Sequence, residues 1–440
     1  MTSFLVDAFV TTSPLAEAFS DASVLQTMLD VEAAVARVQA RLNVIPADAA
    51  VTIGAAARAE FYDPACIAAD ARRSATPIVP LVAALTQRVA ASNPDHAGFV
   101  HWGLTSQDVS DTALVLTIRR SLEILRAQHT KLAASLVALS DQHAGSVMLG
   151  RTLLQPATPI TFGLKVAGWY GAITRSWDAV AQAAEAGLLL QCGGAAGTLA
   201  SLGANGPAVA EGLAVELGLP NPGAPWHAHR DRLASIVTAL AIYVAALGKM
   251  ARDVSLLMQA EVGEVSEPGG ASSAMPHKRN PAGCALILVA ANRLPGLTAG
   301  YLAGMVQEHE RGIGGWQVEW PTMSAVIQTS GSGLAAAVEL VGGLSVNVER
   351  MRTNLNATHG VVCAEGVQMI LTEALGRPRA RAIVEESLAS SRDRSITFGA
   401  ALALIPDAAQ VLRAHPDALV PERYTGSAES MRLRLLNRCL

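Results

Sequence analysis

The chain has 440 residues, more than a typical single domain, which predicts several domains or one long architecture. Its 33 Lys and Arg residues nearly balance its 37 Asp and Glu residues, which argues against the clustered basic excess of a nucleic-acid-binding protein. Hydrophobic residues make up 51% and charged residues 16%, a composition that predicts a large buried core and excludes disorder. Aromatic residues make up only 4%, so we expect closely packed helices rich in Ala, Leu and Val, partly covered by other subunits.

The apolar stretches are too short or too interrupted to predict membrane spans. The longest clean run, residues 233–248, is shorter than the roughly 20 residues that cross a bilayer. Residues 284–304 are interrupted by Asn292 and Arg293. Residues 1–7 show no basic segment ahead of an apolar one, so no signal peptide and a cytoplasmic location are expected. The five cysteines form no CxxC pair and are expected to be reduced core residues: Cys66, Cys192, Cys284, Cys363 and Cys439.

Helical periodicity dominates the chain, and strand signals are almost absent. A helix is predicted over residues 22–42, with Ser20 or Asp21 as its cap. Longer helices are predicted over residues 112–143, 159–190, 231–262, 281–306 and 323–344. Several helices of this length, about 40 Å each, predict an all-α, elongated protomer. We expect an N-terminal helical domain at residues 1–104, a central bundle of long helices at 105–350 and a C-terminal helical domain at 351–440.

Three polar stretches lie at the ends of predicted helices, where loops on a rigid scaffold often carry function. They cover residues 101–108, 150–159 and 267–281. In the third, Pro268, Gly269 and Gly270 predict a mobile backbone. A lysine and an asparagine of this stretch, Lys278 and Asn280, suit the binding of a carboxylate or its enediolate form. A serine held among cationic donors can act as a base, but the same residues are compatible with an ordinary surface turn with capping serines.

The segment Ala271-Ser-Ser-Ala-Met-Pro-His-Lys-Arg-Asn-Pro281 resembles the signature loop of the fumarase/aspartase superfamily, GSSxMPxKxNP, with Ala271 in place of the leading glycine. The other two polar stretches resemble the remaining signature regions of the superfamily, in the same order. The resemblance covers roughly residues 100–320. It implies an all-helical homotetramer in which each active site combines three subunits, a small polycarboxylate substrate, no cofactor, and neither nucleic acid nor membrane as a partner.

The resemblance also implies roles for individual residues. Ser272 corresponds to the catalytic base, which removes or delivers the proton beside a carboxylate. Lys278 and Asn280 complete the expected catalytic set as carboxylate binders, and backbone N–H groups near Met275 would stabilise the aci-carboxylate. Substrate-binding positions are expected at His101, Thr105, Ser106, Gln107, Arg151, Thr152, Gln155, Ser273 and Met275.

The second stretch departs from the superfamily pattern at one position. That pattern usually reads GRTHxQ, and its histidine serves or supports the general acid for the leaving group; here the position is Leu153. A carboxylate that leaves a lactone departs as a stable anion and needs no proton donor. The change therefore favours a cycloisomerase, and the chain is similar to bacterial 3-carboxy-cis,cis-muconate cycloisomerases, which form 4-carboxymuconolactone in protocatechuate degradation. Residues 226–232 and 307–320 add to this resemblance.

Two alternatives remain open from the sequence. Adenylosuccinate lyase, a C–N lyase that releases fumarate, shares the Met-Pro-His-Lys form of the loop. That family resembles Arg-Tyr-Ser-Arg-Pro-Glu-Met near its N-terminus, whereas this chain reads Val10-Thr-Thr-Ser-Pro14 and has no Arg or Lys before Arg37. A non-catalytic structural member of the fold is the other alternative, and the joint presence of Ser272, Lys278 and Asn280 argues against it.

Other motifs receive simpler interpretations. His227 and His229 are two residues apart and no HExxH motif occurs, so no metal site is predicted. Gly331-Ser-Gly333-Leu-Ala-Ala336 matches a dinucleotide-binding pattern, but no strand precedes it, and close helix packing is the favoured explanation. Trp316 and Trp320 could shape a substrate pocket or pack in the core.

Overall fold

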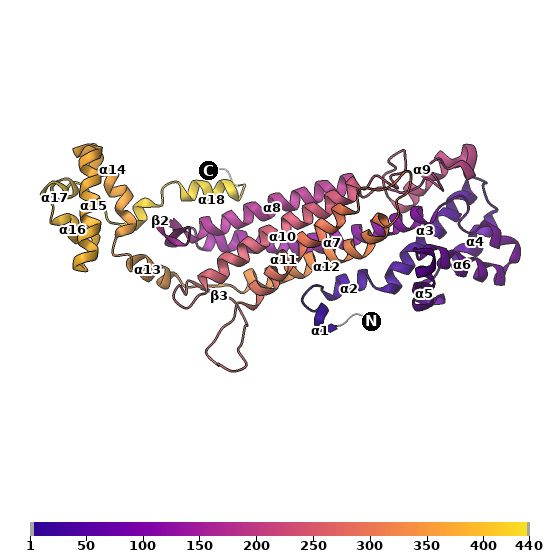
Figure 1. Cartoon of the computed structure of the whole chain (residues 1–440), viewed down its shortest axis with the longest axis horizontal. Helices are drawn as coiled ribbons and strands as arrows, with labels where there is room; N and C mark the ends of the chain where they lie inside the picture. Colours follow the sequence, from indigo (N-terminus) through magenta and orange to yellow (C-terminus); the bar gives the residue numbers. More distant parts are fainter. Residues whose placement is uncertain (1–3, 438–440) are drawn as a thin grey trace. The chain divides into compact units, whose positions relative to one another are not determined.

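The computed structural model describes residues 4–437, which are helical apart from two short two-stranded sheets, and the predicted all-α class is confirmed (Figure 1). The described residues form two compact units. Unit 1 comprises the segment up to His129, Arg175–Gly248 and Leu286–Ala336, and unit 2 comprises Thr130–Thr174, Lys249–Ala285 and the segment from Ala337. Each unit combines parts of two of the three predicted domains, so the boundaries at residues 104 and 350 stay a prediction.

Five long helices carry the middle of the chain, as predicted: α7 (Ser106–Gln142), α8 (Phe162–Gly187), α10 (Asp231–Leu257), α11 (Ala282–Ala303) and α12 (Gly315–Gly342). The boundary between the two units falls within each of them. Two of these helices begin earlier than predicted. Polar side chains in the first turn of α7 obscure its start in the sequence. The predicted start of α12 at residue 323 falls after Pro321, which the structure places inside that helix.

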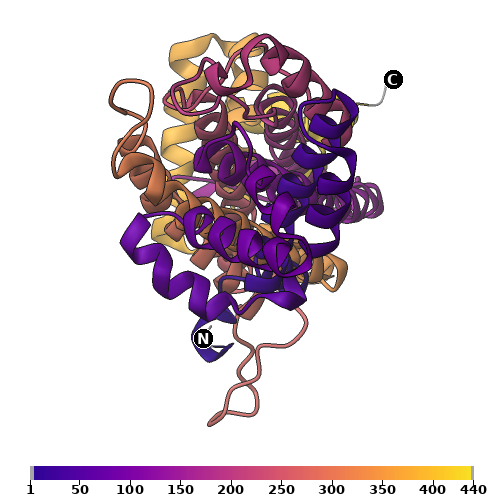
Figure 2. The same cartoon turned by 90° about the vertical axis from the view of Figure 1, so that its right-hand side faces the viewer.

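Unit 1 contains the shorter helices of the N-terminal segment, which face the viewer in Figure 2. They are α1 (Phe4–Asp7), α2 (Ser13–Ala18), α3 (Asp21–Arg41), α4 (Ala47–Ala56), α5 (Pro64–Ser74) and α6 (Ile78–Ser92), with the later α9 (Gly206–Leu217) and three short 3₁₀ turns at Ala59–Phe61, Pro94–Phe99 and Ala200–Asn205. The predicted cap is correct, because the Ser20 hydroxyl accepts the Ser23 backbone N–H at 3.3 Å.

The core of unit 1 forms along closely packed helices. In α10, buried positions recur every three or four residues, at Leu233, Ile236, Leu240, Val244 and Leu247. At Gly333 of α12, an added Cβ would lie 2.8 Å from the Cβ of Ala290 in α11. The Gly331-Ser-Gly333 pattern therefore lies inside a helix and permits close helix packing, as the sequence suggested.

Unit 2 contains both sheets and the C-terminal helices. The elements are β1 (Val147–Thr152), β2 (Gln155–Thr161), β3 (Val265–Ser266), β4 (Ser345–Val346), α13 (Val348–Asn356), α14 (Ala364–Leu375), α15 (Arg377–Arg394), α16 (Phe398–Ala403), α17 (Pro406–Arg413) and α18 (Ala428–Leu435), with 3₁₀ turns at Val361–Cys363 and Pro421–Tyr424. Val367, Leu371, Ile383, Phe398 and Leu402 form the centre of its core.

Within residues 4–437, two helices, α10 and α11, are long and apolar enough to cross a membrane by length and composition alone. In α10, 61% of the most apolar segment is buried within this chain, which is typical of a core helix. In α11 only 28% is buried, and the exposed side chains include Val289 and Leu302. An apolar helix face of this kind is expected to be covered by another surface.

The cysteines are unpaired among the described residues. Cys192, Cys284 and Cys363 are buried, as predicted for core residues. Cys66 is exposed, so that prediction is wrong for this residue: it lies in the first turn of α5, where its thiol donates a hydrogen bond to Asp63. Cys439 lies outside the described residues.

Candidate active site

The 267–281 stretch of unit 2 forms a long loop between β3 and α11, which extends away from the helices in Figures 1 and 2. The Glu267 carboxylate accepts the backbone N–H groups of Gly283 at 2.8 Å and Cys284 at 3.2 Å, which ties the loop to the start of α11. The Asn280 N–H donates to the Gly270 carbonyl at 2.7 Å. Gly270 has a φ of +72°, and an added Cβ would lie 1.8 Å from the Asn280 carbonyl oxygen. Only glycine can therefore occupy position 270, where the two ends of the loop are joined by this hydrogen bond.

The loop carries the three residues expected to be catalytic, Ser272, Lys278 and Asn280. The Ser272 hydroxyl oxygen accepts the backbone N–H of Met275 at 3.1 Å and that of Ala274 at 3.4 Å. Ser272 and Asn280 are half-buried, whereas Lys278 is exposed. Ser273 and Met275 are also exposed. One loop thus carries a hydroxyl, an ammonium and an amide, and the ammonium of Lys278 is exposed to a ligand.

The second stretch, expected to be a loop, forms the β1–β2 hairpin of unit 2. Its strands pair antiparallel from Val147 opposite Thr161 to Thr152 opposite Gln155. The two turn residues, Leu153 and Leu154, have φ angles of +50° and +65°. Such angles are usually found at Asn or Gly, so these leucines carry local strain. The Leu153 side chain is 96% exposed, and Thr152 and Gln155 beside it are exposed as well.

Arg151 of this hairpin is held by a buried carboxylate. Its guanidinium donates to Glu264 at 2.7 and 2.9 Å, and Glu264 also accepts the Asn354 amide at 2.8 Å. The Glu264 side chain is fully buried and directly precedes β3. The charge of Arg151 is therefore matched inside unit 2, where it connects the hairpin to the stem of the 267–281 loop.

His101 of unit 1 is paired with a buried acid. Its Nδ1 lies 2.6 Å from a carboxylate oxygen of Glu32, a residue of α3 that is 2% exposed. Burial alone would lower the pKa of His101, but the Glu32 carboxylate outweighs it and raises the pKa above its usual value. The backbone of His101 is in the left-handed region, with a φ of +57°. The ring is thus fixed, which suits a positioning role.

Thr105 and Ser106 stand at the start of α7 on a turn organised by Asp108. The Asp108 carboxylate accepts the backbone N–H of Thr105 at 3.0 Å and those of Gly193 and Gly194 at 2.8 and 2.9 Å. It also lies 2.8 Å from Nε2 of His227. His227 is buried against this carboxylate, which accounts for it without a metal. Among residues 4–437, no group of three or more His, Cys, Asp or Glu side chains could hold a metal ion.

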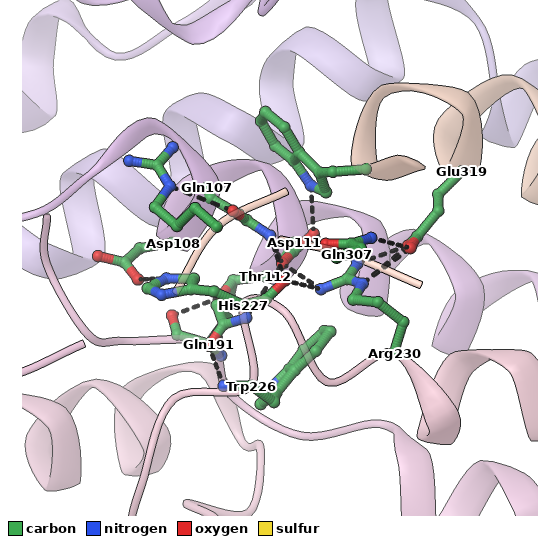
Figure 3. Close-up of polar contacts among 12 residues, drawn as sticks. Gln107, Asp108, Asp111, Thr112, Gln191, Trp226, His227, Arg230, Gln307 and Glu319 are labelled. Atoms are coloured by element: carbon green, nitrogen blue, oxygen red, sulfur yellow. Dashed lines mark hydrogen bonds and ion pairs between the residues drawn. The ribbon is translucent and has the colours of Figure 1, made fainter. Parts of the chain in front are cut away.

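A buried charge cluster lies beside this turn (Figure 3). The Arg230 guanidinium donates to Asp111 at 2.7 and 3.0 Å and to Glu319 at 2.6, 2.8 and 3.1 Å, and all three side chains are essentially unexposed. Asp111 also accepts the Trp316 indole N–H at 3.0 Å. Trp316 therefore packs in the core of unit 1, and with Trp320 it also lines a cavity there, so both expected roles stay predictions.

The cluster sets opposite pKa shifts on its two carboxyl groups. Burial would raise the pKa of Asp111, but the Arg230 guanidinium beside it lowers it below its usual value. For Glu319 burial prevails over Arg230, and its pKa is raised. One buried cation thus serves two acids, so removing it leaves both without compensation. The stretches at 226–232 and 307–320 contain these partners, but no spacing in the sequence indicates that they meet.

Arg311, in the segment between α11 and α12, is a site residue that the sequence did not suggest. Its Nη1 donates to the Thr105 hydroxyl oxygen at 2.5 Å, and its Nε donates to the Gln107 amide oxygen at 3.3 Å. The Gln107 Nε2 donates to the His227 carbonyl at 2.8 Å and to Asp111 at 3.3 Å. Gln107, expected to bind substrate, is 1% exposed, and its amide is occupied by protein partners.

Among the described residues, one well-formed cavity in each unit can be compared with the expected site, and neither is lined by residues of the 267–281 loop. The cavity in unit 1, about 260 Å³, is mostly apolar, and Asp21 is the charged residue in its lining. The cavity in unit 2, about 830 Å³, is lined by Arg151 and Thr152 but also by Glu261 and Glu365. A carboxylate-rich substrate fits neither electrostatic environment.

The expected site residues therefore fall into two groups. The 101–108 turn and Arg311 belong to unit 1, whereas the β1–β2 hairpin and the 267–281 loop belong to unit 2. Within unit 1 hydroxyls and a cation suit the binding of a carboxylate. Within unit 2 the loop carries a serine, a lysine and an asparagine, side chains that suit acid–base chemistry beside a carboxylate.

Comparison with known proteins identifies the family of this chain. A family model described as a lyase matches residues 8–296. The 3-carboxy-cis,cis-muconate cycloisomerase of Pseudomonas aeruginosa is 46% identical, over 87% of this chain and 84% of that protein. The nitrosuccinate lyase of Streptomyces davaonensis is 41% identical, over 95% of this chain and 91% of that protein. The crystal structure of the 3-carboxy-cis,cis-muconate lactonizing enzyme from Pseudomonas putida matches with a TM-score of 0.94 at 40% identity, covering 99% of this chain and 98% of that one. This chain therefore belongs to the lyase family of the fumarase/aspartase superfamily.

Proposed function

We propose that this protein is a 3-carboxy-cis,cis-muconate cycloisomerase that forms 4-carboxymuconolactone in the degradation of protocatechuate. The observation that carries the proposal is Leu153, an apolar side chain at an exposed hairpin tip. The pattern of the lyases in this superfamily, GRTHxQ, has a histidine at the corresponding position. Addition of a carboxylate to a double bond has no leaving group that needs this proton donor. The relatives from Pseudomonas aeruginosa and Pseudomonas putida support the same activity.

In the proposed reaction, one substrate carboxylate oxygen forms a C–O bond to a carbon of the conjugated double bond. The π electrons of that bond move toward the neighbouring carboxylate, which becomes an enediolate. The Ser272 hydroxyl then gives its proton to the carbon beside that carboxylate, forming the C–H bond, and the serine oxygen regains a proton from solvent. The balance is one proton taken up and one carboxylate charge lost to the lactone, with no oxidant, reductant or cofactor consumed.

The loop residues stabilise the charge that builds up during this reaction. Lys278 and Asn280 are assigned to the carboxylate that becomes the enediolate, together with backbone N–H groups near Met275. The Met275 N–H donates to Ser272 in this structure, so the same donor supports the serine oxygen as its proton leaves. A preorganised donor of this kind is commonly worth about 3–4 kcal/mol of barrier.

We also propose that the enzyme is a cytoplasmic homotetramer whose active sites combine three subunits. Support comes from the partly exposed apolar face of α11 and from the exposed leucines at the hairpin tip. A mixing experiment tests this proposal. Ser272→Ala and Thr105→Ala variants, each nearly inactive alone, should regain a substantial fraction of activity when unfolded and reassembled together. Mixed assemblies that stay as inactive as the separate variants would contradict shared sites.

A second candidate function is a C–N lyase acting on a nitro-substituted succinate. The 41% identical nitrosuccinate lyase favours it, because nitrite also leaves as a stable anion and does not need a proton donor at Leu153. Assaying the purified protein with 3-carboxy-cis,cis-muconate, nitrosuccinate and adenylosuccinate separates the possibilities. We expect lactone formation by NMR with the first substrate, and efficient release of nitrite or AMP without lactone formation would overturn the proposed function.

A further inference from the structure

Arg311 is a cation without an acidic partner at the carboxylate-binding turn. Among residues 4–437, no acidic side chain lies within 4.0 Å of its guanidinium nitrogens, whereas the buried Arg230 nearby is shared by two acids. The adjacent Glu308 carboxylate is engaged with the Ile313 backbone N–H at 2.9 Å. The charge of Arg311 is therefore available to a ligand.

The contacts of Arg311 also orient its neighbours. Because the Thr105 oxygen accepts a hydrogen bond from Arg311 at 2.5 Å, the hydroxyl proton of Thr105 is left to point elsewhere. It can donate to a carboxylate that the guanidinium also binds. Gln107 is held through its Nε2 by two protein acceptors, so its oxygen offers Arg311 a fixed support. The guanidinium and the Thr105 hydroxyl can thus share one anionic group, and the hydroxyl of Ser106 follows directly in the chain.

The chemistry of lactone formation calls for such a second cation. Of three substrate carboxylates, one closes the ring and two remain charged in the product. Lys278 and Asn280 are assigned to one of these two carboxylates, beside the carbon that is protonated. The other retained carboxylate needs a separate partner.

We propose that Arg311 is a substrate-binding residue that holds this second retained carboxylate, together with the hydroxyls of Thr105 and Ser106. The inference rests on the proposed function for the number of carboxylates. It assigns Gln107 a positioning role, since it acts on the substrate through Arg311. The substrate class is then a polyanion with at least two carboxylates that persist through the reaction.

A ligand-charge cycle tests the proposal on the full-length protein in its natural assembly. Glutarate and its monoamide, glutaramate, differ by one carboxylate, and calorimetry measures the dissociation constants of both. The unsubstituted protein should bind glutarate about 10- to 100-fold more tightly, the size expected for one charge-assisted hydrogen-bonded contact. Arg311→Met should bind the two compounds within about threefold of each other, and Arg311→Lys should retain part of the difference. Arg119→Met, which removes contacts only to the carbonyls of Leu217 and Gly218, should behave like the unsubstituted protein.

A purely structural role of Arg311 gives a different result. If Arg311 only shaped the turn, Arg311→Met would weaken the binding of glutarate and glutaramate equally. The ratio of their dissociation constants would then be preserved, and this result would overturn the proposal. A preserved ratio in both Arg311 variants, with unchanged melting temperatures, overturns it as well. Turnover provides a second readout, because Arg311→Met should raise KM at least tenfold while kcat changes less. Calorimetry needs no turnover, so the two failures can be distinguished. If the two dissociation constants become similar in Arg311→Met but no lactone forms, the role of Arg311 is supported and the proposed cycloisomerase activity is rejected.

Discussion

The hydroxyl oxygen of Ser272 accepts the backbone N–H of Met275 at 3.1 Å, inside a loop that is closed at its base by Gly270 and Asn280. A second N–H, from Ala274, points at the same oxygen at 3.4 Å. Donors to a hydroxyl oxygen stabilise its deprotonated form more than its neutral form. In the proposed mechanism, these two backbone donors would stabilise the Ser272 oxygen as its proton leaves.

Replacing Ser272 by Ala should lower kcat by about 10²- to 10⁴-fold, the usual contribution of a general acid–base group. Folding should be unaffected, because Ser272 lies on an exposed loop. Ser255→Ala is a matched control, since that hydroxyl only donates to the Arg252 carbonyl on α10. Steady-state kinetics and thermal melting of the two variants provide the check. Turnover by Ser272→Ala within tenfold of the parent would remove the serine from the mechanism.

The base of the loop offers a sharp pair of substitutions. Gly269 and Gly270 have φ angles of +88° and +72°, but only at Gly270 would a Cβ clash with the Asn280 carbonyl, at 1.8 Å. Gly269→Ala should therefore cost only backbone strain, about 1–2 kcal/mol. Gly270→Ala should also displace Asn280 and reduce kcat much further than Gly269→Ala, with similar melting temperatures for both. Equal activities of the two variants would show that this closure does not matter for catalysis.

Removal of the buried guanidinium should be strongly destabilising. Arg230→Met leaves Asp111 and Glu319 buried without their cation, a change that typically costs about 3–5 kcal/mol. Glu319→Gln should cost much less, because the pKa of Glu319 is already raised and Asp111 remains to pair with Arg230. Urea denaturation of the three proteins measures the difference. An Arg230→Met protein as stable as Glu319→Gln would contradict the cluster's structural role.

The His101–Glu32 pair predicts a pH-dependent term in stability. The pKa of His101 is raised in the folded protein, so its stabilising contribution is complete below the unfolded value of about 6.5. It is lost as pH rises through the raised folded value. The stability advantage of the parent over His101→Gln should therefore be larger at pH 6 than at pH 9, as measured by urea midpoints. If the stability advantage of the parent over His101→Gln grew with pH, the result would contradict a raised pKa of His101 in the folded protein.

The long helices could be predicted from the sequence because their signals are local. Helix α3 follows its Ser20 cap, and buried positions of α10 recur at helical spacing. The serine, lysine and asparagine of the 267–281 loop lie within nine residues of one another. Their order in the sequence was therefore enough to show the resemblance to a signature loop.

The β1–β2 hairpin could not be predicted from the sequence because its local residues are not those typical of strands and tight turns. Leu153 and Leu154 occupy positive-φ positions where Asn and Gly are the usual signals. Pro156 and Pro159 lie within β2 and argue against a strand. The buried charge cluster of Arg230 could not be predicted for a different reason. Its partners Asp111 and Glu319 lie 119 and 89 positions away in the sequence. Such partners become visible only when tertiary packing brings them together.

The most direct test of the proposed cycloisomerase is turnover of 3-carboxy-cis,cis-muconate in D₂O. The diene absorbance is followed in the ultraviolet, and the product is examined by NMR. Our account predicts that the absorbance disappears, that 4-carboxymuconolactone forms with one deuterium on the carbon beside the carboxylate, and that Ser272→Ala leaves the diene intact. Unchanged diene absorbance with the unsubstituted protein, alongside fumarate release from adenylosuccinate, would contradict it.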